Sequence, residues 1–557
     1  MSFAGITESG LSGIYAAGTQ LATASHNIAG AAVDGYHRQT VVLNTRPPQL
    51  QNGFYVGTGV NVQSVQRVYD SYLDQQVRNA SSDSGFLDTL ELQTGQVDRA
   101  LSSDQASLLP TVQGFFTALS GIAASPTSTP ARQLVISNAS VMADRFASLQ
   151  NRLNSIRRGV EEGVQSAVSD LNSYAVQLAK VNDLIQQTSL ESRGGSSADL
   201  LDQRDALVTK IASLVNSSTV YRSDGSATVS VGDGRSLVEG NSARAIGTSF
   251  NPNYPAEQSI TITVGSTTTY LKDETISNGK IGALLEVRNK TLDYADGQLG
   301  RVAVALTTAV NAQHVLGYDQ NGAAGQRFFN DQTSIGTATP SSFNSPNSTA
   351  VLSASIVDAS KLTGLHYDIA FDGTSWRITS SDGRAITPTT TSNSPLTYAF
   401  EGVEMAINGT AVAGDRFDLR PTFGKAGGMI LNADIVKNTR LIAASASSDP
   451  KSTGDGRNAQ VMADIQRSAT AIGGANTLAE GYSQLASTVG VQAASAKTRN
   501  AAQTALVEQL KTQQQAVSGV SLDEEAASLL RYQQAYQASS KLLALAGKLL
   551  DSILQIN

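Results

Sequence analysis

The sequence predicts a multidomain α+β protein, in which a terminal α-helical coiled coil and an elongated helical bundle are combined with inserted β-rich modules. Large apolar residues recur every seven positions at both ends of the chain. Between Phe146 and Ile185 they recur every three or four positions, which is typical of one very long helix. Two other stretches alternate apolar and polar residues between turn signals. The patterns follow the order helix, bundle, β, helix, β, bundle, helix, so we expect the chain to run out and return.

The C-terminal helix is expected to begin near Val520 and to reach almost to the last residue. Ser521 and Glu524 have the spacing of a capping box, and Asp523 to Glu525 place negative charge at the helix start. A narrow apolar seam follows the helix and needs another long helix as its partner; its residues are Leu522, Leu529, Tyr532, Tyr536, Leu543, Leu550 and Ile553.

The N-terminal segment shows the same kind of seam, formed by Leu11, Ile14, Leu21 and Ile28. Glycine and serine stand in the neighbouring row, at Gly18 and Ser25, and small residues let helices approach closely. Two seam helices at opposite ends of one chain predict an antiparallel pair. An ordinary amphipathic helix that packs on a globular core is the alternative.

The interior of the chain divides where the spacing of apolar residues changes from a helical to an alternating pattern. Asp224-Gly225 and Asp233-Gly234 are strong hairpin signals, and alternating strands such as that around Trp376 indicate a second β region. Whether the two β regions form one module or two is left open. We predict four parts: a terminal coiled-coil domain of residues 1–35 and 520–557, an elongated helical bundle with short β segments of residues 36–215, 277–315 and 455–519, a β-hairpin-rich insertion of residues 216–276, and an outer β-rich module of residues 316–454.

Composition excludes several classes of protein. The 557 residues have a net charge of −7 and no basic patch, which argues against nucleic acid as a partner. No apolar run approaches the roughly 20 residues that span a bilayer, so we expect no membrane insertion. The first ten residues lack the basic and apolar segments of a signal peptide. With no cysteine, the chain has neither disulfides nor a thiol nucleophile.

No catalytic, cofactor-binding or metal-binding residues emerge from the sequence. The four histidines, His26, His37, His314 and His366, have no metal-ligand spacing. Helix-dipole stabilisation explains the acidic run at residues 523–525. The segment from Asp319 to Gly322 is better explained as a turn than as a calcium loop, because the downstream glutamate is missing. We therefore expect no enzyme activity and no cofactor.

The segment `SHNIAGAAVDGYHRQ` near the N-terminus and the block `SGVSLDEEAASLLRYQQAYQASSKLL` near the C-terminus resemble the axial proteins of the bacterial flagellum, and among them the hook-associated protein 1 family. The segment `SHNIAGAAVDGYHRQ` is similar to the family signature at Asn27, Ile28, Ala29, Gly35 and Tyr36. The block `SGVSLDEEAASLLRYQQAYQASSKLL` matches most specifically and contains Gln533 and Tyr536. Gly30 stands where the family usually has Asn, and Val33-Asp34 replaces Thr-Pro, which leaves open where the first helix ends.

This resemblance implies a structural subunit of the hook–filament junction, located outside the cell and exported by the flagellar type III apparatus without a cleaved signal peptide. The implied partners are the hook protein, hook-associated protein 3, neighbouring copies in a ring, and an export chaperone on the C-terminal helix. A surface adhesin that binds ligands through its β modules is the alternative. The number of subunits in the ring, the angles between domains and the contacts of the outermost module are left open.

Overall fold

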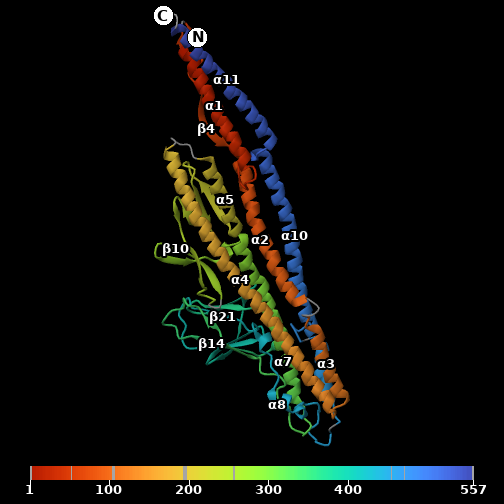
Figure 1. Ribbon diagram of the computed structural model, residues 1–557. Helices are drawn as coiled ribbons and strands as arrows, with labels where there is room; N and C mark the ends of the chain where they lie inside the picture. Colours follow the sequence, from red (N-terminus) through yellow and green to blue (C-terminus); the bar gives the residue numbers. More distant parts are fainter. Residues whose placement is uncertain are drawn as a thin grey trace.

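The molecule is a long rod with both termini at one end (Figure 1). The computed structural model describes residues 3–51, 53–102, 107–191, 197–254, 257–452, 454–469 and 471–554. Helices α1 and α11 form the tip that contains the termini, and α2 and α10 continue the rod side by side. The long helix α4 runs beside them, and the β-rich regions lie along one flank. The chain runs out and returns, as the order of the sequence patterns predicted.

Eleven α-helices are present in the described part of the chain: α1 (Phe3–Gly30), α2 (Ser71–Ser102), α3 (Leu109–Ala124), α4 (Thr129–Glu191), α5 (Ala198–Leu214), α6 (Gly279–Glu286), α7 (Asp293–Leu316), α8 (Ala433–Lys437), α9 (Arg457–Asp464), α10 (Leu478–Ser518) and α11 (Leu522–Leu554). A π-helical segment, η2 (Val287–Leu292), joins α6 to α7. At its N-terminus α10 has a capping box between Thr477 and Glu480.

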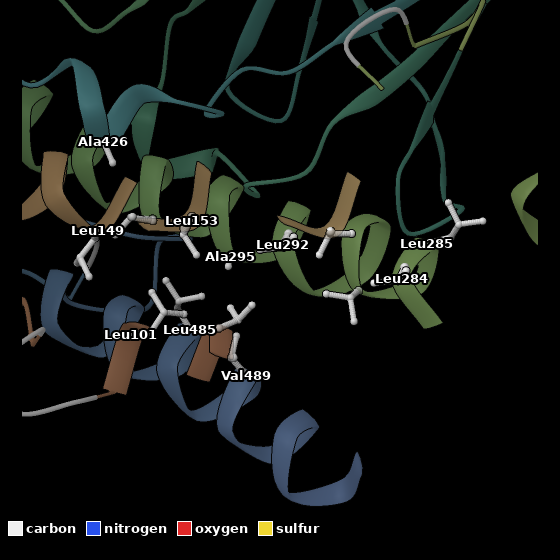
Figure 2. Packing of buried hydrophobic residues seen from close by; sticks show 14 of the residues in the cluster. Leu101, Leu149, Leu153, Leu284, Leu285, Leu292, Ala295, Ala426, Leu485 and Val489 are labelled. Carbon is white, nitrogen blue, oxygen red and sulfur yellow. The ribbon is translucent and has the colours of Figure 1, made fainter. Parts of the chain in front are cut away.

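One continuous apolar core joins the bundle helices. Leu101 of α2, Leu149 and Leu153 of α4, and Leu485 and Val489 of α10 all belong to it (Figure 2). The predicted stripe on α4 supplies much of this core, because residues three or four positions apart share one helix face. Since α4 has 63 residues, the core extends along the rod instead of closing into a sphere.

The strands are short, and every pairing among the described residues is antiparallel. They are β1 (Gln39–Thr45), β2 (Gln49–Gln51), β3 (Phe54–Val56), β4 (Val60–Arg67), β5 (Ser217–Tyr221), β6 (Ala227–Val231), β7 (Arg235–Glu239), β8 (Ser242–Ala243), β9 (Ile246–Phe250), β10 (Gln258–Val264), β11 (Thr267–Tyr270), β12 (Ser334–Thr337), β13 (Thr339–Pro340), β14 (Val351–Ile356), β15 (Tyr367–Phe371), β16 (Trp376–Ser380), β17 (Ala385–Ile386), β18 (Thr389–Asn393), β19 (Leu396–Phe400), β20 (Val403–Asn408) and β21 (Arg416–Leu419).

The two β regions are built differently. Strands β5 to β8 and β9 to β11 form sheets of four and three strands, and their buried apolar residues belong to the bundle core. Strands β12 to β21 form two five-stranded sheets with a separate core, to which Trp376 and residues such as Ile369 and Phe417 contribute. Strands β12 to β21 are therefore a module of their own, whereas strands β5 to β11 are a sheet layer on the helices. The predicted outer module of residues 316–454 extends too far, because Ala426, Met429 and Ile442 belong to the bundle core.

The outer module approaches α7 at two glycines. A Cβ added at Gly297 would lie 2.0 Å from the carbonyl oxygen of Gly364, and one added at Gly300 would lie 1.8 Å from that of Thr422. Arg420 joins the same boundary, because its Nε donates to Asp418 at 2.6 Å and its guanidinium also pairs with Glu257. Glycine is needed on α7 because the backbone of the module occupies the space of a side chain.

Candidate functional site: the paired terminal helices

Helices α1 and α11, here called the terminal pair, pack antiparallel through small residues. Gly10 lies opposite Ser539 and Leu543, where an added Cβ would be 3.6 Å from the Ser539 carbonyl oxygen. At Gly13 an added Cβ would be only 2.6 Å from Ser539 Oγ, and at Gly18 it would be 4.0 Å from the Tyr536 ring. The buried apolar residues of the pair are likewise small: Ala16, Ala17, Ala24 and Ala546. The antiparallel pair predicted from the sequence is thus present, and its helices are closely spaced.

The large residues of the predicted seam are only partly used by this packing. Half-buried positions are Ile14, Leu21, Leu529, Tyr532 and Leu543. Leu11 is 61% exposed and Leu522 is 56% exposed, so neither packs between the two helices as the heptad pattern predicted. The other exposed members are Ile28, Tyr536 and Leu550, and the side chain of Ile553 lies outside the described residues. Much apolar surface of the pair is therefore uncovered within one chain.

The end of α1 is held by the residues of the signature segment. The buried Asn27 side chain donates to the Gln39 carbonyl oxygen and accepts from the Gln39 amide, both at 2.9 Å. It also accepts a hydrogen bond from the Tyr36 hydroxyl at 2.8 Å. The Tyr36 ring lies on Gly30, where an added Cβ would be 2.7 Å from the ring. The helix ends at Gly30 despite the departures there and at Val33-Asp34, and this packing requires the glycine.

The other signature residues turn the chain back. Gly35 has a φ of +79°, a backbone conformation that favours glycine. Ala29 is exposed on the last turn of α1, and Gln533 is exposed on α11. His26, at the helix end, contacts Asp199 at 3.0 Å and the Tyr36 ring.

Arg38 links the base of α1 to the start of α11. Its Nε donates to buried Glu525 at 2.7 Å, and its Nη1 donates to Glu524 at 2.9 Å. Its backbone amide donates to the Ser518 carbonyl oxygen at 2.8 Å. The Ser521 hydroxyl accepts from the Glu524 amide at 3.5 Å, so the predicted capping contact is present in one direction only, and the Glu524 carboxylate binds Arg38.

Next to Arg38, a buried charge cluster around His37 joins the terminal pair to the bundle. Asp202 of α5 accepts from the His37 amide at 3.0 Å, from His37 Nδ1 at 2.8 Å and from Arg67 Nη1 at 2.8 Å. Arg67 also pairs with Asp205 at 2.7 Å, and His37 Nε2 lies 3.6 Å from Asp74 Oδ2 of α2. We call these five residues the His37 cluster. It fixes the segment after α1 to β4, α2 and α5 at once.

The charge of His37 depends on its neighbours. Burial alone would lower the pKa of His37, but the carboxylates of Asp202 and Asp74 raise it to about 9. The pKa of Asp74 is lowered, because hydrogen bonds from His37 and Gln514 outweigh the opposing effect of burial. Arg67 and the Tyr69 ring complete the surroundings of the imidazole. The histidine is thus a cation throughout the neutral pH range.

We expect this cluster to make the base of the terminal pair sensitive to alkaline pH. A raised folded pKa contributes stability that is fully present below the unfolded value of about 6.5 and is lost as pH rises through about 9. This contribution of His37 to stability is at most roughly 3 kcal/mol. Hydrogen exchange of the amides from Arg38 to Leu43, corrected for intrinsic rates, should show protection falling over this interval. His37→Asn should abolish the dependence, and equal slopes in the two proteins would contradict the assignment.

The described residues contain no group of three or more His, Asp or Glu that could hold a metal ion. Among the helices that the structure describes, none is long and apolar enough to cross a membrane.

Family models match three parts of the chain. Residues 94–329 match the model of the "Flagellar hook-associated protein FlgK helical domain", and residues 341–421 match the "Flagellar hook-associated protein 1, D2-like domain". Residues 513–556, which include α11, match the "Flagellar basal body rod FlgEFG protein C-terminal" model. Flagellar hook-associated protein 1 of Escherichia coli K12 is 32% identical over 550 residues, and that of Salmonella typhimurium LT2 is 34% identical over 555; each alignment covers 98% of both chains.

The chain belongs to the flagellar hook-associated protein 1 family. A solved structure of the flagellar hook junction protein FlgK from Burkholderia pseudomallei is also similar, with a TM-score of 0.72 and 26% identity, and the match covers 80% of this chain and all of that one. The chain is therefore a structural component of the flagellum and not an enzyme. The family resemblance recognised in the terminal motifs is confirmed.

Sequence reasoning missed two parts of the site in this family member. Gly10 and Gly13 make the helix contact, yet a search for large apolar residues passes over them. The small-residue spacing on α1 was the available signal. The His37 cluster pairs His37 with Asp202, which is 165 positions away, and no local pattern in the sequence indicates that pairing.

Proposed function

We propose that the chain joins the flagellar hook to the filament and assembles with copies of itself through its terminal pair. The main support is that α1 and α11 meet through small residues and leave large apolar side chains exposed. The exposed residues include Leu11, Tyr15, Leu530 and Leu545. Fully burying one such side chain contributes about 1.5–3 kcal/mol. Contacts with neighbouring chains would supply burial that one chain lacks.

The proposed partners are those that the family resemblance implies, and they would meet the terminal pair at the tip of the rod. We infer contacts with neighbouring copies in a ring, with the hook protein on one side and with hook-associated protein 3 on the other. Residues 1–35 and 520–557 would form the innermost domain, and residues 36–215, 277–315 and 455–519 would form the bundle around it. The segments 216–276 and 316–454 would lie further out. The family membership supports a flagellar setting for all of these contacts.

Before assembly, the same exposed residues of α11 would bind an export chaperone. An amphipathic helix with apolar residues at helical spacing can lay its apolar face into a hydrophobic groove of a partner. We propose export through the flagellar type III apparatus without a cleaved signal peptide, and a final location outside the cell. The absence of cysteine is compatible with passage through compartments of different redox state.

Removal of residues 520–557 tests the proposal. Cells that produce the shortened chain should secrete flagellin into the medium but carry no attached filaments, because the terminal pair is lost. Electron microscopy of the cells and immunoblots of the medium measure the two outcomes. A matched chain without residues 341–421 of the outer module should still allow attachment. Normal filaments on cells with the C-terminal deletion would refute the junction function.

A further inference from the structure

One edge of the sheet on the bundle has no pairing partner. Strand β5 pairs only with β6 in the described structure, because the order of the sheet is β5-β6-β7-β8. The Arg222 amide donates to the Ser226 carbonyl oxygen at the turn between them. Hydrogen bonding alternates along an antiparallel pair, so the backbone groups of Ser217, Thr219 and Tyr221 point away from β6. These groups form a free edge.

This free edge faces a groove. The groove has a volume of about 710 Å³ and lies between β5 and the first turns of α2, with Val208 and Ala212 of α5 in its lining. Ser82 and Asn79 belong to the α2 wall. Four residues of the lining retain a buried side-chain oxygen without a hydrogen-bond partner: Ser82, Asn216, Ser217 and Tyr221. The groove is therefore short of hydrogen-bond partners on its backbone edge and on its walls.

A second unpaired element lies nearer the tip. Residues 47–58, here called the arm, contain the two-stranded ribbon of β2 and β3 and no charged side chain. The base of the arm is fixed, since Arg46 donates to the Gly59 carbonyl oxygen at 3.0 Å and Val60 donates to Ser12 Oγ of α1 at 3.3 Å. Beyond this base Phe54 is 76% exposed and Tyr55 is 75% exposed. The arm presents apolar side chains and a ribbon edge to the surroundings.

We propose that the arm of one copy pairs with the free edge of β5 in a neighbouring copy. A ribbon edge supplies backbone donors and acceptors at the spacing that a β-strand requires, which is the basis of β-augmentation. Along the arm, Leu50 pairs with Tyr55, and the next pair is Gln51 with Phe54. Because hydrogen bonding alternates between neighbouring pairs, one of these two pairs directs its backbone N–H and C=O groups outward, with one residue on each edge of the arm.

The distances favour a second copy over the same chain. Strand β4 leads from the base of the arm toward α2, and its eight residues span about 26 Å at roughly 3.3 Å per residue. The arm itself extends only about 20 Å from its base, on the same rise per residue. The arm would therefore fall short of its own groove, whereas a copy displaced along the rod could place its arm there. Because the arm has no charged side chain, it is not repelled by Arg78, whose guanidinium lies 5.6 Å from the centre of the Tyr221 ring.

This pairing rests on the proposed ring of neighbouring copies and names one of its contacts. Because the chain has no cysteine, a double variant with Tyr55→Cys and Asn79→Cys contains only the two introduced thiols. Both positions are exposed, so the fold should be retained. Mild oxidation of intact flagella followed by nonreducing electrophoresis should give several-fold more linked dimer than the same treatment of a control pair, Tyr55→Cys with Val176→Cys. Val176 lies on α4 and is 62% exposed.

A backbone substitution separates strand pairing from simple proximity. Thr219→Pro removes an outward N–H of the edge strand and should reduce the link, whereas Thr219→Val keeps the N–H and should leave it unchanged. If flagella of the Tyr55→Cys, Asn79→Cys variant hold filaments but give no more linked dimer than the control pair, the inference is overturned and the junction function stands. Equal links in the proline and valine variants would overturn strand pairing. The deletion of residues 520–557 tests the junction function separately.

Discussion

Asp202→Ala should release the base of the terminal pair from the bundle. The substitution leaves His37 and Arg67 buried without the carboxylate that accepts from both, at 2.8 Å each. Removing one partner of a buried ion pair costs about 3–5 kcal/mol, because the remaining charge stays out of water. Hydrogen exchange of the amides from His37 to Leu43 measures the effect as a loss of protection. Local exchange is the suitable measurement because unfolding of a multidomain chain is not two-state.

Asp199→Ala provides the matched control three residues earlier on α5. Asp199 also pairs with a histidine, His26, at 3.0 Å, but both side chains are 46% exposed. Asp199 also accepts from Gln39 Nε2 at 2.6 Å, but exposed ion pairs contribute only about 0–1 kcal/mol, so protection near His37 should fall much less than in Asp202→Ala. If the two alanine variants lost protection equally, the His37 cluster would not be what fixes the terminal pair.

The fold was predictable where local sequence decides structure. The C-terminal helix was expected to begin near Val520, and α11 runs from Leu522 to Leu554. The hairpin signals Asp224-Gly225 and Asp233-Gly234 are turns with φ values of +87° and +91° at the two glycines. These features depend on a few neighbouring residues. The separation of the two β regions was not predictable, because it depends on which core their apolar residues join.

The candidate site was predictable only in outline. Heptad spacing identified both helices, because large apolar residues give the strongest periodic signal. The contact itself uses Gly10 and Gly13, since close approach of two helices requires small residues and leaves larger ones outside. Asp202 gave no signal of its own, because a charged residue on a helix usually faces water. Only the fold shows that it meets His37 and Arg67.

Gly13→Leu should separate the terminal pair and abolish filament attachment. A Cβ at this position already lies 2.6 Å from Ser539 Oγ and 3.3 Å from Ser539 Cβ, so the remaining leucine carbons force α1 and α11 apart. Overpacking of this kind costs about 1–3 kcal/mol. The pair gains little from its small buried residues, so this cost is large relative to its stability. Electron microscopy should show few attached filaments, with flagellin in the medium.

Gly159→Leu is the control for placing leucine at a helical glycine. Gly159 lies in α4, is exposed, and has open space where a Cβ would stand. The substitution should improve helix propensity by about 1 kcal/mol and leave filaments attached. Attachment therefore distinguishes loss of the close helix contact from a general effect of leucine. If Gly13→Leu cells kept normal filaments, the spacing of α1 and α11 would not be required at the junction, and the exposed apolar residues would have to act without it.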